Sequence, residues 1–197
     1  LQLARTLEAH ADELLEANPT LTVDLMLKAL PHIETERLLP SLMRYHQQKC
    51  AAATGGVSSS TSSSKGGGGG SSSVHEGIRL LSRCPPSAAT TDALTLFHAA
   101  YSDSRALFSY LTTAEVRCFD AEYALRVCTD YKREEACVLL LKRRGSFEQA
   151  ARYAIRAGMP DLAKQVLSEG HLEGDAARKL WLEVTSSSSS GGVGGAG

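Results

Sequence analysis

The 197-residue sequence has no excess of either charge and few aromatic residues. It contains 21 Lys and Arg against 22 Asp and Glu, which gives a formal net charge of −1. Surfaces that bind nucleic acid or anionic membranes need clustered Lys and Arg, so this balance predicts neither partner. Aromatic residues make up only 6%, which is low for a sheet protein. Leu and Ala dominate the apolar content, and both favour helices, so an all-α fold is expected.

The sequence also lacks paired cysteines and long apolar runs. It contains five cysteines, an odd number, and no Cys-x-x-Cys motif: Cys50, Cys84, Cys118, Cys128 and Cys137. We expect reduced cysteines packed as small apolar residues, without disulfides or a zinc site. No apolar run approaches the roughly 20 residues of a membrane span, and no signal-peptide pattern is present. Since the chain starts at Leu1 inside a helical pattern, we interpret it as a piece of a longer, cytoplasmic protein.

Motifs for catalysis are missing as well. Neither a Gly-x-Ser-x-Gly nucleophile elbow nor a phosphate-binding loop is present; the glycine run 66–70 lacks the strand before it and the Gly-Lys-Ser/Thr ending. No two histidines are spaced i, i+4, as in many metal sites; they are His10, His32, His46, His75, His98 and His171. We therefore predict no enzyme activity and no catalytic, cofactor-binding or metal-binding residues. The residues that would bind a partner are not identified by the sequence.

Two weaker signals have ordinary structural interpretations. Lys142, Arg143 and Arg144 form the one basic cluster, which we interpret as cations at a helix C-terminus. A site for an acidic partner or an anionic lipid is the alternative. Trp181, the only Trp, is expected to anchor the last helix by packing.

Composition divides the chain into four segments. We predict a helical segment at 1–50, a disordered Gly/Ser-rich insert at 51–73, a second helical segment at 74–185 and a disordered Ser/Gly tail at 186–197. A Gly-rich coil of about 20 residues spans roughly 25 Å, enough to reconnect neighbouring helices. We therefore interpret the insert as a loop within one fold.

Apolar residues recur at helical spacing through both helical segments. The expected helices cover 1–17, 21–30, 33–48, 74–84, 91–101, 104–111, 120–131, 133–144, 147–157, 161–169 and 176–184. Thr20 is expected to cap the second, and Pro40 either kinks the third or starts a new helix. Gly145, Gly158 and Gly170 mark helix ends, and Ser146 with Gln149 forms a candidate capping box.

An internal repeat indicates the architecture. Tyr-Ala-Leu-Arg at 123–126 returns as Tyr-Ala-Ile-Arg at 153–156, and each copy is followed by a second apolar helix. A helix pair that recurs after about 30 residues is typical of an α-solenoid, in which each pair buries its face against the next. Ala124 and Ala154 should then face neighbouring helices.

The stretch from Phe119 to Val184 resembles the vacuolar protein sorting-associated protein 18 family, also called the deep-orange family. Five ordered motifs carry the resemblance: Tyr123-Ala124-Leu125-Arg126 with Cys128, Ala136-Cys137-Val138, Phe147-Glu148-Gln149-Ala150, Asp161-Leu162-Ala163-Lys164 and Lys179-Leu180-Trp181-Leu182. Upstream the likeness is weaker and rests on Leu38, Leu39, Pro40, Leu42, Tyr45, Ile78, Arg79 and Cys84, while Gly77, Leu80 and Leu94-Thr95 depart from the family pattern.

The resemblance implies a clathrin-heavy-chain-type α-solenoid without enzyme activity. Family members are subunits of the HOPS and CORVET complexes, which tether endosomes, vacuoles or lysosomes and promote SNARE-driven fusion. It implies as partners the other core subunits and the SNARE machinery, with a cytoplasmic location peripheral to late endosome and vacuole membranes. Two alternatives stay open: an adaptor of another vesicle coat, or part of a ubiquitin ligase whose RING lies outside this chain.

Overall fold

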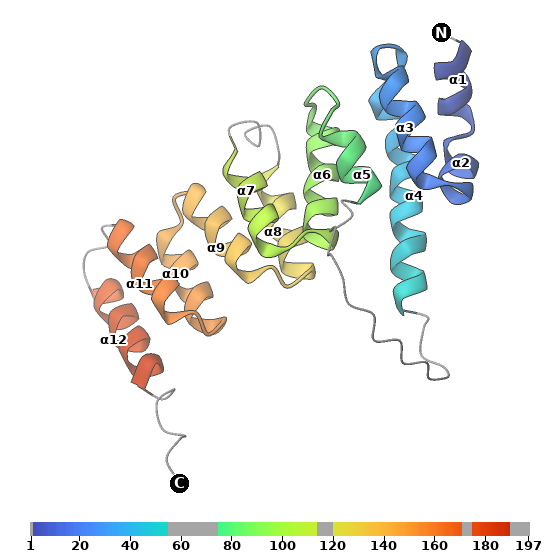
Figure 1. Cartoon of the computed structure of the whole chain (residues 1–197). Helices are drawn as coiled ribbons and strands as arrows, with labels where there is room; N and C mark the ends of the chain where they lie inside the picture. Colours follow the sequence, from blue (N-terminus) through green and yellow to red (C-terminus); the bar gives the residue numbers. More distant parts are fainter. Residues whose placement is uncertain (1, 55–74, 114–119, 171–174, 190–197) are drawn as a thin grey trace, which may run out of the picture. The chain divides into compact units, whose positions relative to one another are not determined.

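The computed structural model describes residues 2–54, 75–113, 120–170 and 175–189 (Figure 1). Every regular element in these ranges is a helix, as expected from the Leu- and Ala-rich composition. The chain divides into two compact units, Leu1–Ser102 and Asp103–Gly197. Nothing in the composition marks this division, because it falls between two ordinary helices.

Unit 1 holds six α-helices and one 3-10 turn in its described residues. They are α1 (Gln2–Ala9), α2 (Ala11–Ala17), α3 (Pro19–Ala29), η1 (Leu30–His32), α4 (Thr35–Thr54), α5 (Glu76–Leu81) and α6 (Ala88–Tyr101). Helix α2 packs against α3 and α4, α5 packs against α3, and α6 packs against α4 and α5. Helices on both sides of residues 55–74 therefore belong to the same unit. The expected insert at 51–73 lies mostly outside the described residues, and α4 continues to Thr54.

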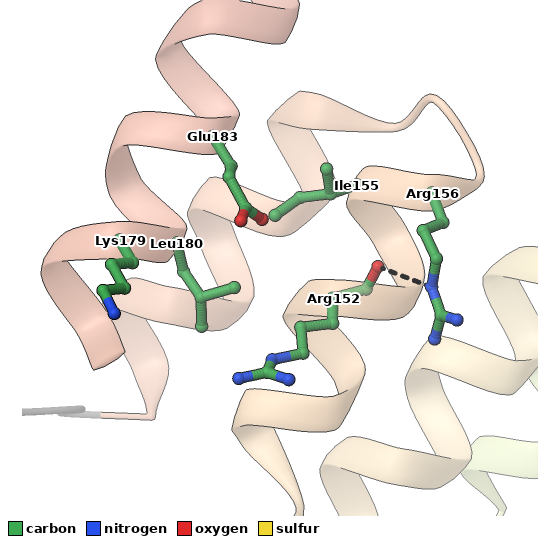
Figure 2. Close-up of a pocket in the computed structure, with 6 residues that line it drawn as sticks. All are labelled: Arg152, Ile155, Arg156, Lys179, Leu180 and Glu183. Carbon is green, nitrogen blue, oxygen red and sulfur yellow. Dashed lines mark hydrogen bonds between the residues drawn. The ribbon is translucent and has the colours of Figure 1, made fainter. Parts of the chain in front are cut away.

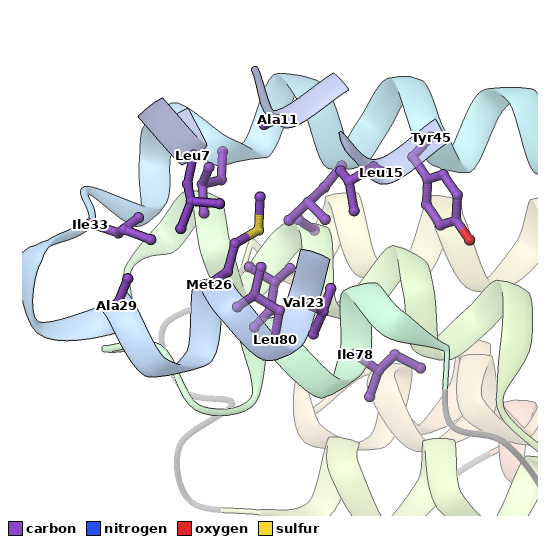
Figure 3. Close-up of a cluster of buried hydrophobic side chains, with 14 of the residues drawn as sticks. Leu7, Ala11, Leu15, Val23, Met26, Ala29, Ile33, Tyr45, Ile78 and Leu80 are labelled. Carbon is purple, nitrogen blue, oxygen red and sulfur yellow. The ribbon is translucent and has the colours of Figure 1, made fainter. Parts of the chain in front are cut away.

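One apolar core connects these helices. Leu7, Leu15 and Met26 of α1–α3 lie together with Ile78 and Leu80 of α5 (Figure 3). Leu15, Met26 and Leu80 are at most 1% exposed. Because the core draws on residues from both sides of the 55–74 segment, unit 1 needs both parts of the chain to complete it.

Three details of the first helices differ from the predictions. The single helix expected at 1–17 is wrong, since the chain breaks at His10 into α1 and α2. The break lets α1 pack against α3 and α2 against both α3 and α4, while Leu3 is left 57% exposed. Thr20 does not cap α3: the Asn18 side chain accepts from the Leu21 N–H at 3.1 Å. Pro19 in the first turn places Asn18 at the capping position, as is usual for a helix-starting Pro.

The next helices also begin or end at unexpected residues. Pro40 lies inside α4 without ending it. Helix α5 is shorter than expected and is capped by His75, whose Nδ1 accepts from the Gly77 N–H at 3.1 Å. Helix α6 starts earlier than expected with a reciprocal capping box, in which Ser87 and Thr90 each bond the other's backbone N–H.

Unit 2 is built from short helices at regular spacing. Its described helices are α7 (Ser104–Thr112), α8 (Ala121–Asp130), α9 (Glu134–Arg143), α10 (Phe147–Arg156), α11 (Pro160–Glu169) and α12 (Asp175–Ser189). The four from α8 to α11 begin 13 residues apart and are 10 residues long. Each packs against the next, and α10 also packs against α12 (Figure 1). Helix α12 runs past the expected end near Val184 to Ser189.

The regular spacing corrects the length of the repeat. Tyr123 is the third residue of α8, whereas Tyr153 is the seventh of α10, so the two strings are one helical turn out of register. The helix pairs themselves repeat after 26 residues, not about 30. A shift of four residues keeps the same helix face. Ala124 and Ala154 are therefore both fully buried, as predicted.

Three consecutive helices of unit 2 end in the same way. Each is followed by a residue in the left-handed region: Lys132 with φ 53°, Gly145 with φ 79° and Gly158 with φ 72°. The next N–H then bonds back to the last turn, from Arg133 to Cys128 O, from Ser146 to Leu141 O and from Met159 to Ala154 O, at 2.8–3.0 Å. This is the Schellman arrangement. The sequence predicts helix ends at Gly145, Gly158 and Gly170, and nothing in it marks a left-handed residue at Lys132. Gly170 also ends a helix, with an ordinary φ of −74°.

The capping box predicted at Ser146 and Gln149 is wrong. Ser146 has ψ 58° and its side chain makes no capping hydrogen bond, whereas Ser87 of the genuine box has the extended ψ of 164°. A capping side chain needs an extended backbone to reach the first-turn N–H groups. Arg133 and Met159, at the equivalent junctions, have ψ of 70° and 68° and no side-chain cap either. The Schellman turn fixes this geometry, so the junction accepts residues that cannot cap.

Candidate interaction surface

Two of the cysteines lie in the apolar core. Cys128 and Cys137 are fully buried thiols, and burial raises the pKa of Cys128 to about 12. These two cysteines pack as predicted, whereas Cys50 and Cys84 are half-buried. Cys118 and His171 lie outside the described residues. Within the ranges the structure describes, no three His, Cys, Asp or Glu side chains gather as a metal site.

The structure brings together an aromatic cluster that the sequence did not reveal. His75 stacks on Tyr101 with ring centroids 3.8 Å apart, and Nδ1 of His46 lies 2.8 Å from the Tyr101 hydroxyl. The Cys50 sulfur is 3.8 Å from both His46 nitrogens, so it is aligned with neither as a nucleophile–base pair would be. Burial lowers the pKa of His46, and that of His75 to about 4, which keeps both rings neutral at pH 7. Neutral rings suit packing between α4, α5 and α6.

The basic cluster of the sequence is committed to the fold. Lys142 pairs with Glu169 of α11, and the Arg143 guanidinium donates to the Leu111 carbonyl of α7. Arg144 pairs with Glu122 of α8 at 3.0 Å. The last turn of α9 is thus tied to three neighbouring helices, and the interpretation as cations at a helix C-terminus is confirmed. The Lys142 ammonium also lowers the pKa of Glu169.

A different basic group lines a cleft of about 540 Å³ between α10 and α12 (Figure 2). We call it the α10–α12 cleft; it is lined by Arg152, Ile155, Arg156, Lys179, Leu180 and Glu183. Arg152 pairs with Glu148 at 2.6 Å, and the Arg156 Nε donates to the Arg152 carbonyl at 3.4 Å. Among the described residues, neither Arg156 nor Lys179 forms an ion pair. The sequence does not reveal this group because Lys179 lies 23 residues after Arg156 and 27 after Arg152, and the three come together only because α10 packs against α12.

Helix α12 presents apolar residues to the outside. Leu180 and Val184 are buried and hold the helix against its neighbours, but Trp181 is 40% exposed and Leu182 is 69% exposed. The prediction that Trp181 anchors the last helix is therefore wrong. Adjacent helical residues point about 100° apart, so burial of Leu180 turns Trp181 away from the core.

Comparison with known proteins identifies the architecture. The family model described as "VPS18, alpha-solenoid domain, second half" matches residues 2–188. The chain belongs to the VPS18 family. The α-solenoid predicted from the repeat and the resemblance to this family are both confirmed.

The family assignment has a curated relative. The vacuolar protein sorting-associated protein 18 homolog of Danio rerio is 24% identical to this VPS18-family segment over 180 residues. That alignment covers 87% of the present chain and 16% of the relative, so the chain spans about a sixth of the relative's length. No helix in the described ranges is both long and apolar enough to cross a bilayer.

Proposed function

We propose that this chain is a non-enzymatic scaffold segment of a membrane-tethering subunit of the HOPS/CORVET type. The observation that carries the proposal is the match to the second half of the VPS18 α-solenoid across almost the whole chain. Stacked helix pairs use their inner residues to hold one another, which leaves outer and edge surfaces for partners. The polar side chains described above support this role, since they tie helices together or cap them.

In this proposal the segment acts in endosome-to-vacuole or endosome-to-lysosome transport. Its partners are the other core subunits and, through the complex, the SNARE machinery. In this proposal the full protein acts in the cytoplasm, peripherally on late endosome and vacuole membranes. A near-neutral net charge supports recruitment through protein partners more than direct attraction to anionic lipid.

Affinity purification of the full-length protein tests this function. We expect the tagged protein to recover the other HOPS and CORVET core subunits. A matched full-length chain that lacks only residues 2–188 should lose part of this set while remaining soluble. Loss of the whole protein should block late-endosome fusion with the vacuole. Recovery of vesicle-coat components in place of tethering subunits would contradict the proposal and favour a coat adaptor.

A further inference from the structure

The α10–α12 cleft has the chemistry of a site for an acidic ligand. Three cations from two helices, Arg152, Arg156 and Lys179, line it, against one lining carboxylate, Glu183. Arg156 and Lys179 have no ion-pair partner in the described part of unit 2, whereas the basic end of α9 is fully engaged. Cations that are gathered in a concave surface and not neutralised by neighbours attract anionic groups.

The cleft also has an apolar floor. Leu180 is 3% exposed and belongs to the apolar core of unit 2, and the half-buried Ile155 packs against that core. Figure 2 shows Arg152 and Leu180 extending into the space between the two helices. A volume of about 540 Å³ falls within the usual range for ligand clefts, about 300–1,000 Å³. The ligand should therefore combine carboxylates with an aliphatic side chain.

Flanking acidic residues favour a peptide over a membrane surface. Glu148 lies beside Arg152, and Asp175 at the start of α12 is 92% exposed. Near an extended anionic bilayer these carboxylates would be repelled, whereas a narrow peptide can place its acids only where the cations lie. Glu183 also lines the cleft, so the part of the cleft near its carboxylate disfavours a further acid.

We propose that the α10–α12 cleft binds an acidic peptide segment of a partner protein, with carboxylates on Arg156 and Lys179 and an aliphatic side chain over Ile155 and Leu180. This rests on the proposed scaffold function, because it assigns one partner-binding surface to the solenoid. The peptide titration described next uses this chain alone. Its failure would leave the co-purification test of the scaffold function unaffected.

The test is a fluorescence-anisotropy titration of the full 197-residue chain into a labelled synthetic peptide of glutamates with two central leucines. The cleft variant Arg156→Glu with Lys179→Glu should weaken binding about tenfold or more. A neutral version, Arg156→Gln with Lys179→Gln, should weaken peptide binding by a smaller factor. It keeps the test decisive if the charge-reversed variant fails to fold. The matched control, Arg105→Glu with Arg126→Glu, changes the net charge equally at exposed positions of α7 and α8. It should bind within about twofold of wild type.

Two further arms identify the ligand chemistry. Replacing the peptide leucines by serines should weaken binding, and so should raising the ionic strength toward 1 M, because salt screens exposed charges. No saturable peptide binding, or an equal loss in the cleft and control variants, would overturn the proposal. Binding to phosphatidylserine vesicles that the cleft variant abolishes, without peptide binding, would also overturn it and assign the cleft to a membrane.

Discussion

Exchanging residues at the left-handed helix ends of unit 2 should change stability in opposite directions. Gly145 and Gly158 occupy the same place in consecutive Schellman turns as Lys132 does in the first, with φ of 53–79°. A Cβ built on either glycine has no heavy atom within 4 Å. Gly145→Ala and Gly158→Ala therefore test backbone conformation without a steric clash, and Lys132→Gly is the reverse exchange.

The magnitude follows from two opposing terms. A residue with a Cβ in the left-handed region costs roughly 1–2 kcal/mol relative to glycine. Replacing glycine also restricts the unfolded chain, which offsets about 0.4–1 kcal/mol. Each Gly→Ala change should therefore lower the free energy of unfolding by about 1 kcal/mol. By the same reasoning Lys132→Gly should raise it by up to about 1 kcal/mol.

Urea unfolding followed by helical circular dichroism measures these differences. Gly170→Ala is the contrasting control, because φ there is ordinary but the new Cβ would lie 2.7 Å from the Phe147 Cβ. That variant should be destabilised by close contact alone. If Gly145→Ala and Gly158→Ala are neutral, or if Lys132→Gly destabilises, the left-handed ends do not carry the strain assigned to them.

Further expectations concern packing, capping and pH. Ala154 of α10 is fully buried, so Ala154→Trp should overfill its site and lower the free energy of unfolding by roughly 1–3 kcal/mol in the same urea assay. An unchanged urea midpoint would contradict this packing. Ser87→Ala should lower the free energy of unfolding by about 1 kcal/mol, because Ser87 caps α6. Ser146→Ala should leave it almost unchanged, because the Ser146 side chain makes no capping hydrogen bond. Equal losses in urea unfolding would contradict this difference. Burial lowers the folded-state pKa of His75 to about 4 from 6.5, so the unfolded chain binds more protons between these values. Thermal stability should therefore fall as pH drops from about 6.5 toward 4. The substitution His75→Asn, whose side chain can still cap α5, should make the melting temperature less dependent on pH. An unaltered pH profile in this variant would exclude His75 as the source of the dependence.

The sequence predicts most helices because their signals are local. Apolar spacing and the glycines at 145 and 158 place the helices of unit 2 within a few residues of their observed bounds. The left-handed turn at Lys132 has no such signal, because a lysine is rare there. Backbone hydrogen bonds from Lys132 and Arg133 to the last turn of α8 close it, and α8 packs against α9. Ser146 shows the opposite error: its sequence context fits a capping box, but the preceding turn fixes an unsuitable ψ.

The sequence predicts least well which charged and apolar side chains are available at the surface, because this depends on contacts between residues far apart in the sequence. Residues 142–144 form a basic cluster in the sequence, yet each of the three side chains pairs with or donates to a neighbouring helix. Arg156 and Lys179 carry no sequence signal, yet they line one cleft once α10 and α12 pack together. The prediction for Trp181 is wrong for a related reason, because the packed face of α12 contains Leu180 and not the adjacent Trp181.

The different connectivity of the two units has a consequence for how fast each can fold. In unit 2 the main packing partners are helices one or two positions apart, so a nascent chain can complete each contact soon after it is synthesised. In unit 1, α3 must wait for α5, which lies beyond residues 55–74. Local contacts close quickly, and each doubling of loop length adds about 0.6 kcal/mol to closure. In refolding experiments unit 1 should therefore form later than unit 2. On the ribosome α3 should be left without α5 until the 52 residues from Leu30 to Leu81 have been added.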